Sequence, residues 1–139
     1  MPLREVAFSL LKDAENSFKE NGKFSDEVFQ GLHDVFGEVF VKAAEILESG
    51  VVMRYETPNG VRVIFKVTNK KETYTLFDNI NFCYCSMFAQ EVLVNRKLLT
   101  CKHVLAVRLA EISDQVEVIK LTDLQYIDFV RDVVNYIKE

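Results

Sequence analysis

The sequence CYC at 83–85 is followed, after fifteen residues, by CKH at 101–103, and these two triplets hold every cysteine of the chain. They also hold one of its two histidines. Cysteines that only fill a core would be scattered, so this grouping indicates shared chemistry. Residues two apart on a regular helix point to different sides, so each triplet should lie on a turn or at the start of a helix.

Three cysteines and one histidine form a complete ligand set for zinc. Zinc prefers four sulfur or nitrogen ligands in a tetrahedron, and a closed Cys3His set is typical of structural sites. We predict one structural zinc ion per chain, bound by Cys83, Cys85, Cys101 and His103. Such binding is worth about 10–16 kcal/mol in isolated finger peptides, so metal and fold should be inseparable. The alternatives are buried core cysteines or a redox-active Cys-x-Cys pair.

The size and composition indicate one soluble domain. A chain of 139 residues with 49% hydrophobic and 27% charged residues can bury one moderate core. No run is long and apolar enough for a bilayer and the amino terminus shows no cleavage signal, so we expect an intracellular protein. We expect a single domain over 1–139, with helices in 1–48, a zinc module in 51–112 and a terminal helix over 122–138.

The first third of the chain has helical periodicity. Apolar residues after Pro2 recur at helical spacing until Asn21 and Gly22, which is a natural stop. Ser25 can cap a second helix, which runs to about Leu47 and is apolar over a broad arc. This predicts an N-terminal helical pair, in which two different surfaces pack on the second helix.

The period then changes to alternation. Residues 51–57 and 61–67 read as strands, and Pro58 with Asn59-Gly60 between them predicts a hairpin turn. A third strand is expected over 72–77. The fold class is therefore α+β, with a small antiparallel three-stranded meander.

Helices should follow both ligand triplets. Ser86 can begin a helix that runs to about Val94, and another should start near His103 and end near Ile112. The first ligand pair then leaves a strand and the second enters a helix. The result is a Cys3His zinc knuckle with following helices, which ties the sheet edge to those helices.

The last helix carries two adjacent apolar stripes, more than a terminal helix needs for docking. The first stripe consists of Ile127, Val130, Val134 and Ile137. The second is a candidate partner interface and consists of Tyr126, Phe129, Val133 and Tyr136. The alternative is that both stripes belong to a well-buried core.

Basic residues are concentrated near the second ligand triplet. Between Val92 and Ala110 there are four cations and no acidic residue, whereas the rest of the chain carries 13 basic and 21 acidic residues. The net charge of −4 argues against a free-standing nucleic-acid binder. The four cations are Arg96, Lys97, Lys102 and Arg108, and they are candidate nucleic-acid contacts. The alternatives are that they form a solvated face or that they offset the negative charge of the zinc site. The other histidine, His33, is interpreted as an ordinary surface residue.

The segments CYCSMF at 83–88 and CKHVLA at 101–106 resemble the SWIM zinc finger, whose form is CxC, a spacer and CxH. Ala106 matches the subgroup found in Shu-complex subunits, and it lies one turn from His103, where a larger side chain would press on the metal site. Phe88 belongs to the same similarity and should support the site. Ser86 stands where a relative has proline, which is neutral because serine can also begin a helix.

The resemblance implies a non-catalytic nuclear subunit that pairs with a RecA-family recombinase paralogue and helps recombinase filaments form during recombination repair. Any contact with DNA would then occur through the complex. The sequence has no GxxxxGK phosphate loop, so ATP chemistry would belong to the partner. The alternative is a stand-alone DNA-binding zinc finger. A thiol oxidoreductase or zinc hydrolase is disfavoured, because a hydrolase needs an open zinc position and a nearby carboxylate base.

Overall fold

The computed structural model describes the backbone of residues 3–138 and the side chains of residues 5–132 and 134. The helices are α1 (Leu3–Asn21), α2 (Asp26–Phe36), α3 (Glu38–Ser49), the π-helix η1 (Phe88–Val94), α4 (Lys102–Ile112) and α5 (Asp123–Lys138). The strands are β1 (Val51–Glu56), β2 (Val63–Asn69), β3 (Glu72–Phe77) and β4 (Glu117–Lys120). No helix in the described part of the chain has the length and apolar character of a membrane span.

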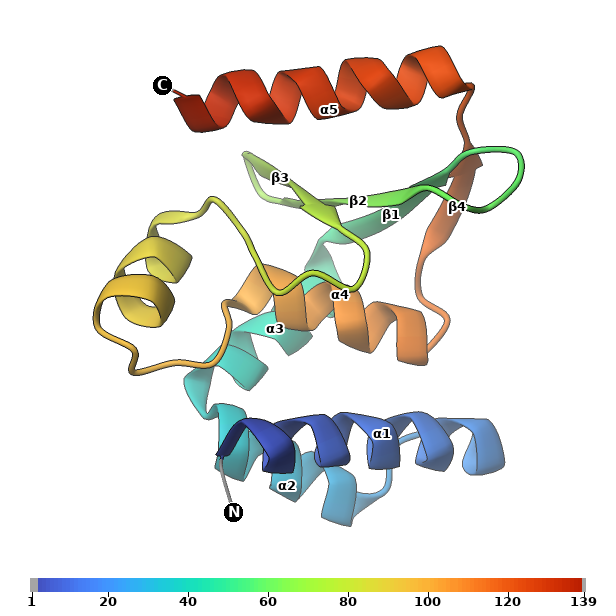
Figure 1. Cartoon of the computed structure of the whole chain (residues 1–139). Helices are drawn as coiled ribbons and strands as arrows, with labels where there is room; N and C mark the ends of the chain where they lie inside the picture. Colours follow the sequence, from blue (N-terminus) through green and yellow to red (C-terminus); the bar gives the residue numbers. More distant parts are fainter. Residues whose placement is uncertain (1–2, 139) are drawn as a thin grey trace.

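The elements form layers around one sheet (Figure 1). Helices α3 and α4 cover the inner face of the sheet, α1 and α2 lie beyond them, and α5 crosses the outer face. The core between the sheet and the helices is continuous, and its fully buried side chains include Leu32, Ile46, Phe65, Leu105 and Leu109. The predicted α+β class is confirmed.

The N-terminal region contains three helices, so the predicted pair is wrong in one respect. The long second helix is broken at Gly37, whose φ of 60° lies in the left-handed region that favours glycine. The break lets α2 pack on α1 while α3 packs on α4, which accounts for the broad apolar arc. The cap at Ser25 is confirmed, since its Oγ accepts a hydrogen bond from the Val28 amide at 3.2 Å.

The sheet has the strand order β3-β2-β1-β4. The first three strands form the predicted antiparallel meander, with the turn closed by a 2.8 Å hydrogen bond from the Gly60 amide to the Thr57 carbonyl. The predicted three-stranded sheet is too small, because β4 adds a fourth strand parallel to β1, with Met53 opposite Glu117. This strand carries the chain from the inner side of the sheet to α5.

Candidate metal centre

The four predicted ligands come together from two segments of the chain. Cys83 and Cys85 lie in the loop after β3, Cys101 is the residue that precedes α4, and His103 lies in the first turn of that helix. Cys101 has an extended backbone, with φ −99° and ψ 171°, where the chain enters α4. This change of conformation lets Cys101 and His103 approach the same metal site although they are only two residues apart. All four side chains are buried and their ligand atoms lie within 4.8 Å of one another.

The spacing of the ligand atoms fits a tetrahedral zinc site. His103 Nδ1 lies 3.7 Å from the sulfur of Cys83 and 3.9 Å from the sulfur of Cys101. Zinc bonds of about 2.3 Å to sulfur and about 2.0–2.1 Å to nitrogen, at tetrahedral angles, would separate these atoms by about 3.6 Å. The Cys3His group can therefore hold one zinc ion, with His103 coordinating through Nδ1.

The electrostatics of the cluster favour a bound dication. Hydrogen bonds from Cys101 and Cys83 lower the pKa of Cys85, whereas hydrogen bonds to Cys101 and Cys85, together with burial, raise the pKa of Cys83. A hydrogen bond with Cys83 lowers the pKa of Cys101, but one with Cys85 and burial outweigh it and raise that pKa to about 11. Burial raises the pKa of the thiols, and a bound dication would supply the charge that releases their protons.

Aromatic residues enclose the site. The Tyr74 ring of β3 lies 4.3 Å from the His103 ring, and the Tyr84 hydroxyl accepts a hydrogen bond from the Thr75 amide at 2.9 Å. Phe88 is 1% exposed and its amide donates to the Cys85 sulfur at 3.4 Å. These contacts fix the ligands against the sheet and exclude water from the sulfurs.

A polar contact joins the two ligand segments independently of the metal. The Thr100 hydroxyl donates to Asn81 Oδ1 at 2.7 Å, and Asn81 Nδ2 donates to the Leu99 carbonyl at 2.9 Å. Asn81 precedes Cys83 by two residues and Thr100 precedes Cys101 by one. This pair was not predicted from the sequence, where its one signal is that both residues lie within two positions of a ligand.

Ala106 and Phe88, which the sequence predicts to support the metal site, are both buried. Ala106 is fully buried on α4, in the turn that follows His103, and Phe88 packs edge-on against Phe82 with ring centroids 5.6 Å apart. Both positions belong to the core that surrounds the metal site.

The four candidate basic contacts do not share one environment. Arg96 and Lys97 are exposed in the segment after η1, and Lys102 is half-buried at the start of α4. Arg108 instead faces α1, where its guanidinium lies 3.9 Å from Glu15. Lys102 therefore lies between two ligands, Arg96 and Lys97 lie in the exposed segment before the second ligand triplet, and Arg108 pairs within the helical layer.

Two of the candidate interface residues on α5 contact the chain's own β1 strand and the loop that follows it. Phe129 packs against Tyr55 with ring centroids 5.0 Å apart, and the Arg62 guanidinium lies 5.5 Å from the Tyr126 ring. The side chains of Val133 and Tyr136 lie outside the described residues. Among the α5 side chains that the structure describes, the exposed apolar ones are Leu124, Ile127 and Val134.

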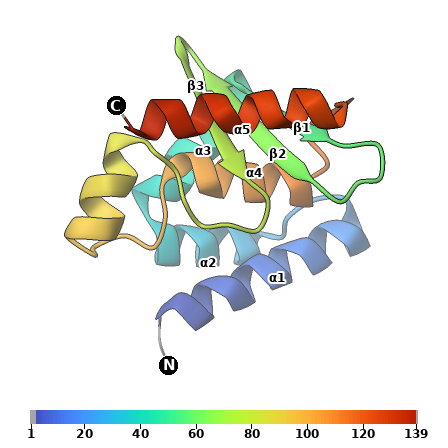
Figure 2. The same ribbon diagram turned by 45° about the horizontal axis from the view of Figure 1, so that its top comes forward.

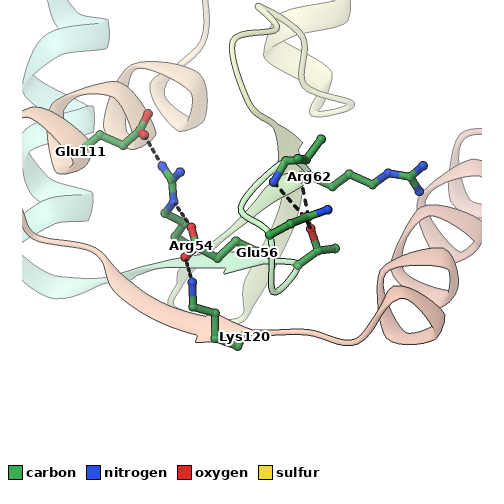
Figure 3. Close-up of polar contacts among 8 residues, drawn as sticks. Arg54, Glu56, Arg62, Glu111 and Lys120 are labelled. Atoms are coloured by element: carbon green, nitrogen blue, oxygen red, sulfur yellow. Dashed lines mark hydrogen bonds and ion pairs between the residues drawn. The ribbon is translucent and has the colours of Figure 1, made fainter.

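A chain of ion pairs connects the end of the sheet to α4 (Figure 3). Lys120 of β4 pairs with Glu56 of β1, Glu56 also accepts a hydrogen bond from Arg54 at 3.0 Å, and Arg54 donates to Glu111 of α4 at 2.8 Å. Burial, followed by the nearby charge of Asp78, raises the pKa of Glu111. These contacts hold the helix that starts at the metal site against β1 and β4.

A buried, closed Cys3His site between a strand and the start of a helix, in the order CxC then CxH, defines a zinc-binding protein of the SWIM type. The chain is 30% identical to Zinc finger SWIM domain-containing protein 7 of Danio rerio over 109 residues, 78% of each chain. It is 27% identical to the Mus musculus protein of the same name over 136 residues, 98% of this chain and 90% of that one. The Homo sapiens protein of the same name is 27% identical over 126 residues, which are 91% of this chain and 90% of that one. The chain belongs to the Zinc finger SWIM domain-containing protein 7 family.

No protein-family model and no solved structure gave a significant match to the chain. The family assignment therefore depends on the full-length relatives and on the Cys3His site.

Proposed function

We propose that this chain is a non-catalytic, zinc-dependent subunit of a Shu-type complex. It pairs with a RecA-family recombinase paralogue in the nucleus and promotes homologous recombination and DNA repair. The observation that carries the non-catalytic part is the burial of all four ligands, each at most 4% exposed. A closed set leaves zinc no position for substrate or water, so its role is to hold the fold.

The resemblance to Shu-complex subunits supports the partner. The sequence has no phosphate-binding loop of its own, so the nucleotide chemistry of such a complex belongs to the other subunit. What this chain contributes is a zinc-held surface for that subunit.

The test is affinity purification of the tagged chain from cells of its source organism, with the bound proteins identified by mass spectrometry. The recovered recombinase paralogue is then co-expressed with the chain. We expect a stoichiometric heterodimer, and we expect a fluorescent fusion in the nucleus. The Cys101→Ser variant should lose both zinc and partner. A chain that is monodisperse and stable alone, and that recovers no recombinase-like protein, would contradict the proposal.

A second candidate is direct DNA binding by the zinc finger. It is favoured by the exposure of Arg96 and Lys97 in the loop between the two ligand triplets, without an ion pair among the described residues. Direct binding predicts submicromolar affinity at physiological salt and a steep salt dependence, both lost when the two charges are reversed. Weak binding that is unchanged by the reversal would eliminate this candidate.

A further inference from the structure

The fifteen residues between Cys85 and Cys101 form a projecting loop, residues 86–100, that contains η1. Figures 1 and 2 show η1 to one side of the body, away from the layer of α1 and α2 and beyond the edge of the sheet. A predicted metal ligand flanks the loop on each side, Cys85 before it and Cys101 after it, so a bound zinc ion would close the loop at its base.

The base of the projecting loop is also fixed by protein contacts. Asn81 binds Thr100 and the Leu99 carbonyl, and Phe82 packs on Phe88. Phe88 of η1 is buried in the core, and Met87, Val92, Leu98 and Leu99 pack against it. The loop is therefore held to the body at its base and along one side of η1, whereas residues 93–97 take no part in the core.

The outer part of the projecting loop is ordered by its own backbone. The Asn95 amide donates to the Gln90 carbonyl at 2.8 Å, and the amides of Lys97 and Leu98 both donate to the Glu91 carbonyl, at 2.8 and 3.1 Å. Arg96 has a φ of 54°, which turns the chain back toward the body. The tip thus has a defined shape before any partner is present, which lowers the entropic cost of binding.

The tip displays a chemically mixed surface. Residues 93–97 are all exposed. The first two of them are aliphatic, Leu93 at 56% and Val94 at 67% exposure. Arg96 and Lys97 follow directly and make no ion pair among the described residues. An apolar pair next to unpaired cations is the complement of an apolar recess bordered by carboxylates.

We propose that the tip of the projecting loop, residues 93–97, docks into such a recess on the partner protein. This inference rests on the proposed function and names the surface that the partner uses. Burial of Leu93 and Val94 would supply the apolar contribution, while Arg96 and Lys97 would pair with acidic side chains at the rim. A protein is favoured over nucleic acid because exposed aliphatic side chains gain little against a phosphate backbone, and the tip carries no aromatic ring for stacking on bases.

The experiment measures affinity for the co-purified recombinase paralogue by calorimetry. One variant is Leu93→Ala with Val94→Ala, and a second is Arg96→Glu with Lys97→Glu. The matched control is Leu124→Ala with Ile127→Ala, which removes exposed aliphatic side chains from α5 instead. We expect both tip variants to bind about tenfold or more weakly, with one zinc per chain and an unchanged melting temperature, and the control to bind as wild type.

Wild-type affinity in both tip variants, or a loss confined to the α5 control, would overturn the docking site while leaving the proposed function intact. If the wild type recovers no recombinase paralogue, the proposed function itself fails. If charge reversal abolishes binding to a DNA duplex of random sequence, and partner affinity is unchanged in both tip variants, the ligand of the tip is nucleic acid and the inference is wrong.

Discussion

The two faces of the sheet are covered in different ways. On the inner face, Phe65 and Val67 of β2 belong to a continuous apolar core that reaches the metal ligands. On the outer face, Ile64 is fully buried, and α5 crosses this face (Figure 1), where its described contacts with the sheet join aromatic rings and a lysine. Lys66 Nζ lies 4.2 Å from the Phe129 ring, and Phe129 also packs on Tyr55.

This difference indicates how stability is divided. Burial of apolar area and metal coordination each stabilise by several kcal/mol, whereas a single ring–ring or cation–π contact is worth about 0.5–1.5 kcal/mol. Helix α5 also leaves Leu124 75% exposed. The inner face should therefore determine whether the chain folds, and the outer face should adjust its stability.

Loss of zinc should have the largest effect. Cys101→Ser, or treatment of the wild type with a strong chelator, is expected to remove about 10 kcal/mol or more, which exceeds the total stability of many small domains. Metal analysis and circular dichroism should show less than one zinc per chain and no cooperative melting transition. If Cys101→Ser kept one zinc per chain and melted like the wild type, the inner face would not depend on the metal for its stability.

Adjacent residues of β2 test the two faces directly. Phe65→Ala on the inner face should cost about 3–5 kcal/mol, and Ile64→Ala under α5 about 2 kcal/mol, because α5 can settle into the space left by the smaller side chain. Both side chains are fully buried, so exposure alone predicts no such difference. Urea unfolding with zinc present measures both values, and equal costs would show that α5 is as firmly packed as the core.

Removal of the main ring contact of α5 should have a moderate effect. Phe129→Ala is expected to cost about 1–2 kcal/mol, since it removes the contacts with Lys66 and Tyr55 together. Zinc content should not change. Phe129→Leu is the control that keeps apolar volume while losing the ring, and a loss as large as that of Phe65→Ala would contradict the peripheral role of α5.

The contact between the ligand segments should be worth about 1 kcal/mol. Asn81→Ala leaves the Thr100 hydroxyl without its acceptor, and Thr100→Val removes the same hydrogen bond at nearly constant volume. Both variants should release zinc faster to a colorimetric chelator while keeping the wild-type fold. Release at the wild-type rate from both would mean that the metal alone holds the two segments together.

The ion pair between β4 and β1 should have the smallest effect and should depend on pH. A hydrogen bond from Lys120, followed by one from Arg54, holds the pKa of Glu56 below its usual range. A carboxyl whose pKa is lowered in the folded state stabilises the fold above its unfolded pKa of about 4.3, and this stabilisation is lost as the pH falls through the folded value. Lys120→Ala should therefore be slightly less stable than the wild type at pH 7.

The difference in unfolding free energy between Lys120→Ala and the wild type, measured with urea at several pH values, isolates this pair because both proteins share the same metal ligands. The difference should shrink as Glu56 becomes protonated. A difference that is constant with pH would show that Lys120 acts through packing and not through its charge.

Local chemistry explains what the sequence could predict. The ligands were identifiable because all three cysteines fall in one constellation, and the β1–β2 turn because Asn59-Gly60 favours its geometry. The third strand and the cap at Ser25 were likewise predicted from alternation and residue type.

The misses have non-local causes. The apolar period continues through Gly37, so only packing against α1 and α4 reveals the break between α2 and α3. β4 is four residues long and mostly exposed, and it is stabilised by pairing with β1 more than sixty residues away. The π-type hydrogen bonds of η1 leave no mark in residue order, so an ordinary helix was predicted there.

The π-helix has a consequence for the direction of the projecting loop. Successive residues of an α-helix are rotated by about 100° around its axis, and a π-turn accommodates one residue more than an α-turn. Deletion of the exposed residue Ala89 is expected to turn the π-turn into an α-turn, which would rotate Leu93 and Val94 by about that angle relative to Cys85. The direction in which this aliphatic pair points therefore depends on a single residue of η1.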